Sequence, residues 1–131
     1  MVDIEKIVIV VKKTWLEELT EKFNTKAQAN FYIVQNQSVD HWNYYEDSDV
    51  QYKESLALLK RSIPSSYKTQ VIQREFLPNF LFNSSDLVVV IGPDGLVVNA
   101  AKYLEDQYIL AINPDPKRIN GVLLPFRVGD F

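Results

Sequence analysis

The sequence contains no cysteine, and its 131 residues include only one histidine and four glycines. The absence of cysteine excludes disulfide bonds, thiolate metal ligands and cysteine nucleophiles. Because the single histidine, His41, stands in a polar stretch, we interpret it as a surface residue and expect no protein-bound metal ion. A chain without cysteine is compatible with a reducing compartment, and we expect the protein in the cytoplasm.

Long apolar runs and a one-sided charge are also missing. The longest apolar runs, Ile7–Val11 and Leu87–Ile91, have the length of a strand and are too short to cross a bilayer. The formal net charge is −3, with acidic and basic residues interspersed, so no basic stripe exists that would follow a phosphate backbone. We therefore expect neither a membrane nor a nucleic acid as the partner.

The residues that are present alternate between strand and helix patterns. Apolar β-branched runs, typical of strands buried on both faces, indicate a parallel sheet. We predict strands at Lys6–Val11, Lys68–Arg74, Leu87–Ile91, Tyr108–Ile112 and, as a short one, Val122–Leu124. Because strands that alternate with helices form a sheet covered on both sides, we expect residues 1–131 to be a single α/β domain. Its predicted architecture is a three-layer, Rossmann-like fold with a mostly parallel sheet flanked by helices.

Capping motifs mark two predicted helices in the first half of the chain. Thr14 and Glu17 have the spacing of a capping box and stand before apolar residues at helical intervals. A second capping signal begins at Thr25, and the apolar face predicted for that helix is Ala27, Phe31 and Val34. The segment Phe31–Val34 also fits a short strand, and the sequence alone leaves both interpretations open.

The stretch Gln35–Asp49 is polar and aromatic, and we predict it as a loop. A further capping signal at Ser48 predicts the start of a third helix, which Pro64 ends. The apolar stripe of that helix is Tyr52, Leu56, Leu59 and Ile63. Pro78 interrupts the aromatic stretch Phe76–Phe82, which we predict as a packed connector.

A glycine-containing loop follows the clearest predicted strand. The loop is Gly92-Pro93-Asp94-Gly95, and the helix predicted after it is marked by Val97, Ala100, Ala101 and Leu104. Ligands of open α/β sheets bind outside the carboxyl ends of the strands, and a helix N-terminus suits phosphate. The same four residues also make a good type I turn without any function. The loop is neither a Walker A motif nor a complete dinucleotide fingerprint.

Residues on both sides of this loop resemble the NAD kinase family. The resemblance is carried by Asp86-Leu-Val-Val-Val-Ile-Gly-Pro-Asp-Gly95, a helix, the strand Tyr108–Ile112, and then Asn113-Pro-Asp-Pro-Lys-Arg118 with Gly121. The family has a Gly-Gly-Asp-Gly-Thr loop where this sequence has Gly92-Pro93-Asp94-Gly95 followed by Leu96. The segment Asn113–Arg118 is most similar to mitochondrial-type members and to bacterial relatives labelled sugar kinases. The resemblance is specific over Asp86–Phe126 and architectural before it.

The resemblance implies a phosphotransferase that moves a phosphoryl group from ATP to the ribose 2′-hydroxyl of NAD, giving NADP. It implies Mg²⁺ bound mainly through the nucleotide phosphates, and a homo-oligomer of the complete protein. Asp94 is the implied catalytic residue. The implied nucleotide- and phosphate-binding residues are Gly92, Gly95, Leu96, Asn99, Asn113, Asp115 and Arg118. For Asn113–Arg118, the alternative is a rigid proline turn with solvated charges.

The sequence departs from the family pattern in the loop. Pro93 stands where the family has a second glycine, which removes one amide donor, and Leu96 stands where the family has threonine. Family members carry a second, β-rich domain that this chain does not contain, so we expect residues 1–131 to be an N-terminal domain that is inactive alone. The alternatives are a diacylglycerol-type lipid kinase, which shares the Gly-Gly-Asp-Gly loop, and a non-catalytic nucleotide-binding or regulatory module.

Overall fold

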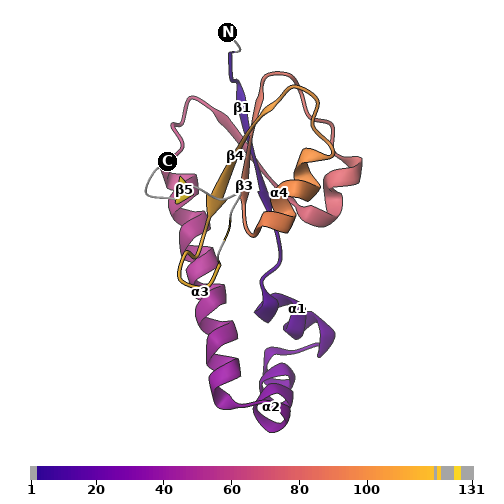
Figure 1. The fold of residues 1–131 in the computed structure, drawn as a ribbon, viewed down its shortest axis with the longest axis vertical. Helices are drawn as coiled ribbons and strands as arrows, with labels where there is room; N and C mark the ends of the chain where they lie inside the picture. The colour runs from indigo at the N-terminus through magenta and orange to yellow at the C-terminus, as the bar shows by residue number, and fades with distance from the viewer. Residues whose placement is uncertain (1–2, 120, 122–125, 128–131) are drawn as a thin grey trace. The chain divides into compact units, whose positions relative to one another are not determined.

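In the computed structural model, five parallel strands form one sheet within the described residues, 3–119, 121 and 126–127, in the order β2-β1-β3-β4-β5 (Figure 1). The elements are β1 (Lys6–Val11), α1 (Trp15–Lys22), α2 (Lys26–Asn36), α3 (Val39–Ser62), β2 (Lys68–Gln73), the 3₁₀ helix η1 (Arg74–Asn79), β3 (Asp86–Ile91), α4 (Asp94–Ala101), β4 (Tyr108–Asn113) and β5 (Phe126–Arg127). The predicted α/β fold with a parallel sheet flanked by helices is confirmed. The strand predicted at Val122–Leu124 lies outside the described residues.

The chain divides into two compact units. The sheet unit consists of Met1–Lys12 and Ser55–Phe131, and the helical unit consists of Lys13–Glu54. Helix α3 contributes to both, because its residues up to Glu54 belong to the helical unit and the rest to the sheet unit. All of the residues that carry the family resemblance belong to the sheet unit.

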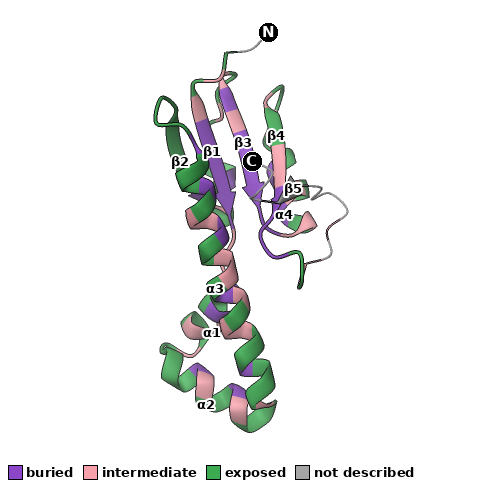
Figure 2. Cartoon of the chain, turned by 90° about the vertical axis from the view of Figure 1, so that its left-hand side faces the viewer, coloured by how far each residue is buried: buried purple, intermediate pink, exposed green. Residues whose placement is uncertain are grey.

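The core of the sheet unit lies on both faces of β1 and β3, which are buried along most of their length (Figure 2). Because successive side chains of a strand point to opposite faces, each strand supplies two apolar layers. One layer joins β1 and β3 to η1 and α4 and contains Val8, Val10, Ile72, Leu77, Val88, Val90, Leu96 and Ala100. The C-terminal part of α3 covers the other face (Figure 1), where Leu59 is fully buried.

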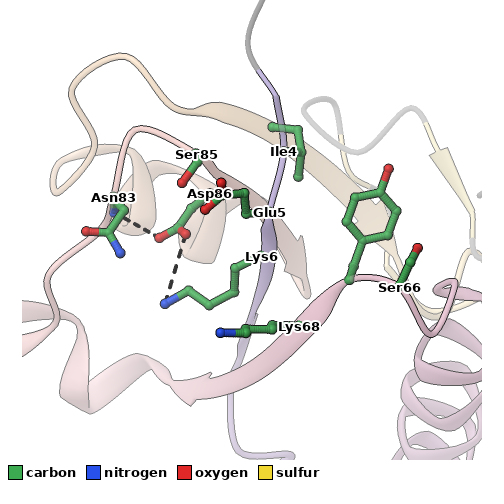
Figure 3. A pocket seen from close by; sticks show the side chains of 9 residues that line it. Ile4, Glu5, Lys6, Ser66, Lys68, Asn83, Ser85 and Asp86 are labelled. Carbon is green, nitrogen blue, oxygen red and sulfur yellow. Dashed lines mark hydrogen bonds and ion pairs between the residues drawn. The ribbon is translucent and has the colours of Figure 1, made fainter.

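A buried carboxylate begins β3 at the amino edge of the sheet (Figure 3). Asp86 is only 1% exposed. Its Oδ2 accepts a hydrogen bond of 2.9 Å from the Asn83 amide, and its Oδ1 lies 4.0 Å from Lys6 Nζ. These contacts close the turn into β3 and compensate the burial of the charge, so we assign Asp86 a structural role.

The helical unit confirms the first two predicted helix starts. The Thr14 hydroxyl accepts a hydrogen bond from the Glu17 amide (3.2 Å), and Glu17 Oε1 accepts one from the Thr14 amide (3.1 Å). The Thr14 hydroxyl also donates to the buried carboxylate of Asp49 at 2.6 Å. The Thr25 hydroxyl accepts from the Gln28 amide, and α2 follows it. The core of this unit is Leu16, Ala29, Ile33 and Trp42.

Two predictions about the start of α3 are wrong. The predicted loop Gln35–Asp49 is largely helical, since α2 continues to Asn36 and α3 begins at Val39. The start of α3 is set by Ser38, whose hydroxyl accepts from the His41 amide at 3.1 Å. Ser48, predicted as a cap, lies inside α3, and its hydroxyl donates to the Tyr45 carbonyl.

The buried face of α2 also differs from the prediction. The buried residues are Ala29 and Ile33, whereas Phe31 is 69% exposed. The whole of Phe31–Val34 is helical, so the alternative of a strand is wrong as well. Trp42 explains these differences. It packs against Ala29 and Ile33, and this tertiary contact outweighs the more apolar stripe that the sequence suggests.

The ion pair between Lys53 and Asp49 should make the free energy of unfolding depend on pH. Lys53 Nζ lies 2.9 Å from Asp49 Oδ2, and this hydrogen bond raises the pKa of Lys53. A raised pKa in the folded state adds stability that is complete below the unfolded value of about 10.4 and is lost as the pH rises through the folded value. Because the Lys53 side chain is 59% exposed, the contribution is at most about 1 kcal/mol. Chemical denaturation of Lys53→Met should show a small, constant loss between about pH 6 and 9 that fades as the pH rises through the raised pKa of Lys53. A loss that persists at high pH would contradict this assignment.

Candidate functional site

The loop after β3 places an acidic residue at the start of a helix. Pro93 is the N-cap of α4 and has extended backbone, and Asp94 is the first residue of the helix. The Asp94 side chain is partly exposed at the carboxyl edge of the sheet. A carboxylate in the first turn is favoured by the helix dipole. The structure therefore presents Asp94 at the edge where ligands of α/β sheets bind.

Glycine stands at positions 92 and 95 of the loop for different physical reasons. Gly92 is buried, and a Cβ atom there would lie 2.8 Å from Leu96 Cδ2. Packing explains this glycine. Gly95 is exposed, and a Cβ atom there would meet no atom within 4 Å. Because glycine in a helix costs up to about 1 kcal/mol relative to alanine, Gly95 lowers the stability of α4 and leaves its backbone open to a ligand.

The open space at Gly95 leads to a testable expectation. Gly95→Ala should raise the free energy of unfolding by up to about 1 kcal/mol, because alanine favours the helix and meets no obstacle. If a nucleotide approaches this backbone, the same variant should weaken ATP binding, measured by calorimetry. Ala101→Gly, at the exposed C-terminal end of α4, is the matched control, since it should destabilise the helix without affecting ATP. Unchanged ATP affinity in a stabilised Gly95→Ala variant would show that no ligand uses this space.

Leu96 and Asn99 occupy different environments on α4. The Leu96 side chain is 2% exposed and belongs to the core beneath the helix, and its amide donates to the Pro93 carbonyl at 2.9 Å. A phosphate contact from the Leu96 amide would therefore compete with an existing hydrogen bond. Asn99 lies one turn further along α4 and is partly exposed. The structure gives Leu96 a packing role and leaves Asn99 accessible.

The turn after β4 lies beside the loop after β3. The parallel register pairs Ile91 with Ile112, and the Gly92 amide donates to the Ile112 carbonyl at 3.3 Å. Asn113 ends β4, so it lies next to Gly92 at the same edge of the sheet. The two segments that carry the family resemblance are thus brought together, as the sequence predicts for neighbouring parallel strands.

Asn113 holds the turn closed. Its side chain is 7% exposed; Nδ2 donates to the Ile119 carbonyl at 2.8 Å, and Oδ1 accepts from the Asp115 amide at 2.9 Å. Both ends of the side-chain amide are therefore used within the turn. These two bonds make Asn113 a residue that positions backbone, and a direct contact to ribose requires one of them to be exchanged.

Asp115 and Arg118 form an ion pair inside the same turn. Arg118 Nη1 lies 3.0 Å from Asp115 Oδ2 and 3.3 Å from Oδ1, and Asp115 is 4% exposed. The Asp115 carbonyl also accepts from the amides of Arg118 and Ile119. Asp115 therefore neutralises much of the positive charge that the sequence offers to a phosphate at Arg118.

Ser55 is a residue of this site that the sequence analysis missed. Its hydroxyl donates to the Pro114 carbonyl at 2.6 Å, and Ser55 is 7% exposed. This bond joins the C-terminal part of α3 to the turn after β4. The two residues are 59 positions apart, and a serine within a helical pattern carries no signal of such a contact. Only the fold reveals it.

Among the described residues, no group of three or more histidine, cysteine or acidic side chains could hold a metal ion. Within 3–119, 121 and 126–127, no helix is long and apolar enough to cross a membrane. Over the same residues, every buried side-chain nitrogen and oxygen atom has a hydrogen-bond partner. The buried polar side chains at this edge are thus satisfied within the chain.

Comparison with known protein families finds no family model that matches the chain, and comparison with curated proteins finds no significant match. The resemblance over Asp86–Phe126 therefore depends on its motifs alone. The activity that it implies is a proposal, argued from the geometry of the site.

Proposed function

We propose that the chain is the nucleotide-binding part of an NAD-kinase-type phosphotransferase, which transfers a phosphoryl group from ATP to the ribose 2′-hydroxyl of NAD. One observation carries the proposal. A partly exposed carboxylate, Asp94, begins a helix at the carboxyl edge of a parallel sheet, beside a glycine whose Cβ position is open. This arrangement brings a proton acceptor and accessible backbone to one place.

In this mechanism Asp94 orients the acceptor hydroxyl and accepts its proton. The hydroxyl oxygen forms a bond to the γ-phosphorus of ATP while the bond from that phosphorus to the bridging oxygen breaks, and ADP leaves. The backbone around Gly95 lies where the phosphates approach the first turn of α4. Mg²⁺ neutralises phosphate charge when bound, and the oxygen ligands that it prefers are supplied by the phosphates themselves.

The turn after β4 supports the proposal because its fixed backbone would border the nucleotide site. Asn113 and Ser55 fix the backbone of this turn from inside. The Asp115–Arg118 pair lies within the same turn, so incoming phosphate oxygens can compete with Asp115 for the guanidinium. We infer that these residues shape the nucleotide site, with Asn113 acting as a positioning residue.

A second function, a non-catalytic nucleotide-binding module, is favoured by two specific observations. The amide of Leu96 is engaged with Pro93, and Arg118 is engaged with Asp115, so two of the expected phosphate contacts are occupied. The test is NADP formation from ATP and NAD by the complete protein, alongside calorimetric binding of NAD. NAD binding without any NADP formation would establish the module. Phosphorylation of diacylglycerol instead of NAD would establish a lipid kinase.

A further inference from the structure

The order in which strands are added to the sheet reverses between β1 and β3. β2 lies on one side of β1, and β3, β4 and β5 follow on the other. The connection from β2 to β3 passes through η1, which packs on the same face as α4, whereas the C-terminal part of α3 covers the opposite face (Figure 1). Such a reversal between β1 and β3 is the topological switch point of an open α/β sheet, outside which ligands bind.

Lys12 stands at this switch point. β1 ends at Val11 and β3 ends at Ile91, so Lys12 and Gly92 are the residues that directly follow these adjacent strands. The paired register ends at Val10 and Val90, and both chains leave the sheet at the same edge shortly after it. Lys12 is partly buried and belongs to the sheet unit.

The alternation of side chains indicates which face position 12 shares. Val8 and Val10 belong to the core layer that contains Leu96 and Ala100 of α4. Extended by one residue beyond the end of β1 at Val11, this alternation predicts that Lys12 lies on the face of α4. The Cβ position of Gly92 points to the same face, because it meets Leu96. Lys12 is therefore placed on the side of the sheet where Asp94 and Gly95 begin their helix.

Two other cations at the carboxyl edge are less well placed. Arg118 is paired with Asp115 at 3.0 Å. Arg74 follows β2, which is separated from β3 by the whole of β1. We propose that Lys12 binds the polyphosphate of the nucleotide at the switch point between β1 and β3.

This inference rests on the proposed function for the identity of the anion. A lysine ammonium carries three donors, so it can keep a protein partner while it binds a phosphate oxygen. Its charge compensates for the amide that Pro93 cannot supply and for the charge of Arg118 that Asp115 neutralises. Lys12 carries no signal in the sequence because a lysine after a strand is ordinary, and its significance depends on the strand order.

The test compares Lys12→Met with the wild-type chain by calorimetric titration with ATP, sodium tripolyphosphate and adenosine. We expect affinity for ATP and for tripolyphosphate to fall roughly ten- to hundredfold, because a hydrogen bond to a charged group is lost. Affinity for adenosine should not change. Lys12→Arg should recover most of the loss. Lys102→Met, an exposed lysine at the far end of α4, removes the same charge and should behave as wild type.

Equal tripolyphosphate affinity in the wild type and Lys12→Met, or no measurable binding by the wild type, overturns the proposal. A loss for tripolyphosphate that Lys102→Met reproduces also overturns it, because the effect would then be net charge. Melting temperatures of all variants show whether each chain is folded, and Lys12→Gln, which also removes the charge, replaces Lys12→Met if that variant does not fold. NADP formation by Asp94→Asn is measured separately. If that variant keeps its turnover, the role of Asp94 fails while the Lys12 site stands.

Discussion

Replacement of Asp94 with asparagine is expected to lower NADP formation by the complete protein about 10²- to 10⁴-fold, the range that a positioned general base contributes. Asparagine has nearly the same size and keeps an acceptor oxygen, but it cannot take the proton of the ribose hydroxyl at neutral pH. Because Asp94 is partly exposed at the start of α4, the substitution should leave the fold intact. Steady-state turnover at saturating ATP and NAD measures the effect.

The control for this variant is Asp106→Asn, which changes an exposed carboxylate in the segment after α4. It should retain wild-type turnover. NAD affinity of Asp94→Asn should stay close to that of the wild type, which separates a chemical defect from a binding defect. Wild-type turnover in Asp94→Asn would show that Asp94 is not the general base of the proposed reaction.

Replacement of Leu96 with alanine is expected to lower the free energy of unfolding by about 2–5 kcal/mol, as for other buried leucines. Leu96 is 2% exposed and packs with Val88, Val90 and Ala100 between α4 and the sheet. The deletion leaves a cavity beneath the first turns of the helix, next to Gly92. Chemical denaturation monitored by circular dichroism gives the change directly.

Leu96→Met provides the control for this core position. Its volume is conserved, so we expect a loss below about 1.5 kcal/mol and unchanged ATP affinity. A stability of Leu96→Ala close to that of the wild type would contradict the packing role. If Leu96→Met weakened ATP binding strongly while it remained stable, residue 96 would act on the nucleotide, as the family resemblance first suggests.

The sheet was predictable because its strands carry a strong local signal. β1 and β3 consist of β-branched residues that are apolar on both faces, and such runs have few alternatives in a small α/β domain. The capping box at Thr14 was equally readable, since its partners are three residues apart. These features depend on neighbours in the sequence, and the fold does not change them.

The first half of α3 was not predictable for the opposite reason. Its residues are mostly polar, and the helix is held by tertiary contacts, which include the packing of Trp42 with residues of α1 and α2 and the hydrogen bond from Thr14 to Asp49. The candidate site likewise contains one feature that the sequence predicts and one that only the fold reveals. The proximity of Gly92 and Asn113 follows from parallel neighbouring strands. The hydrogen bond from Ser55 to Pro114 does not, because it joins side chain and backbone across 59 residues.

The closed turn from Asn113 to Ile119 has a consequence for the thermodynamics of binding. Its backbone is already tied by Asn113, Asp115 and Ser55 before any nucleotide arrives. Ordering a mobile residue costs about 1–2 kcal/mol of backbone entropy, and a turn that is already ordered avoids this cost. Nucleotide association on this side should therefore follow lock-and-key kinetics, with a rate that does not wait for the loop to fold.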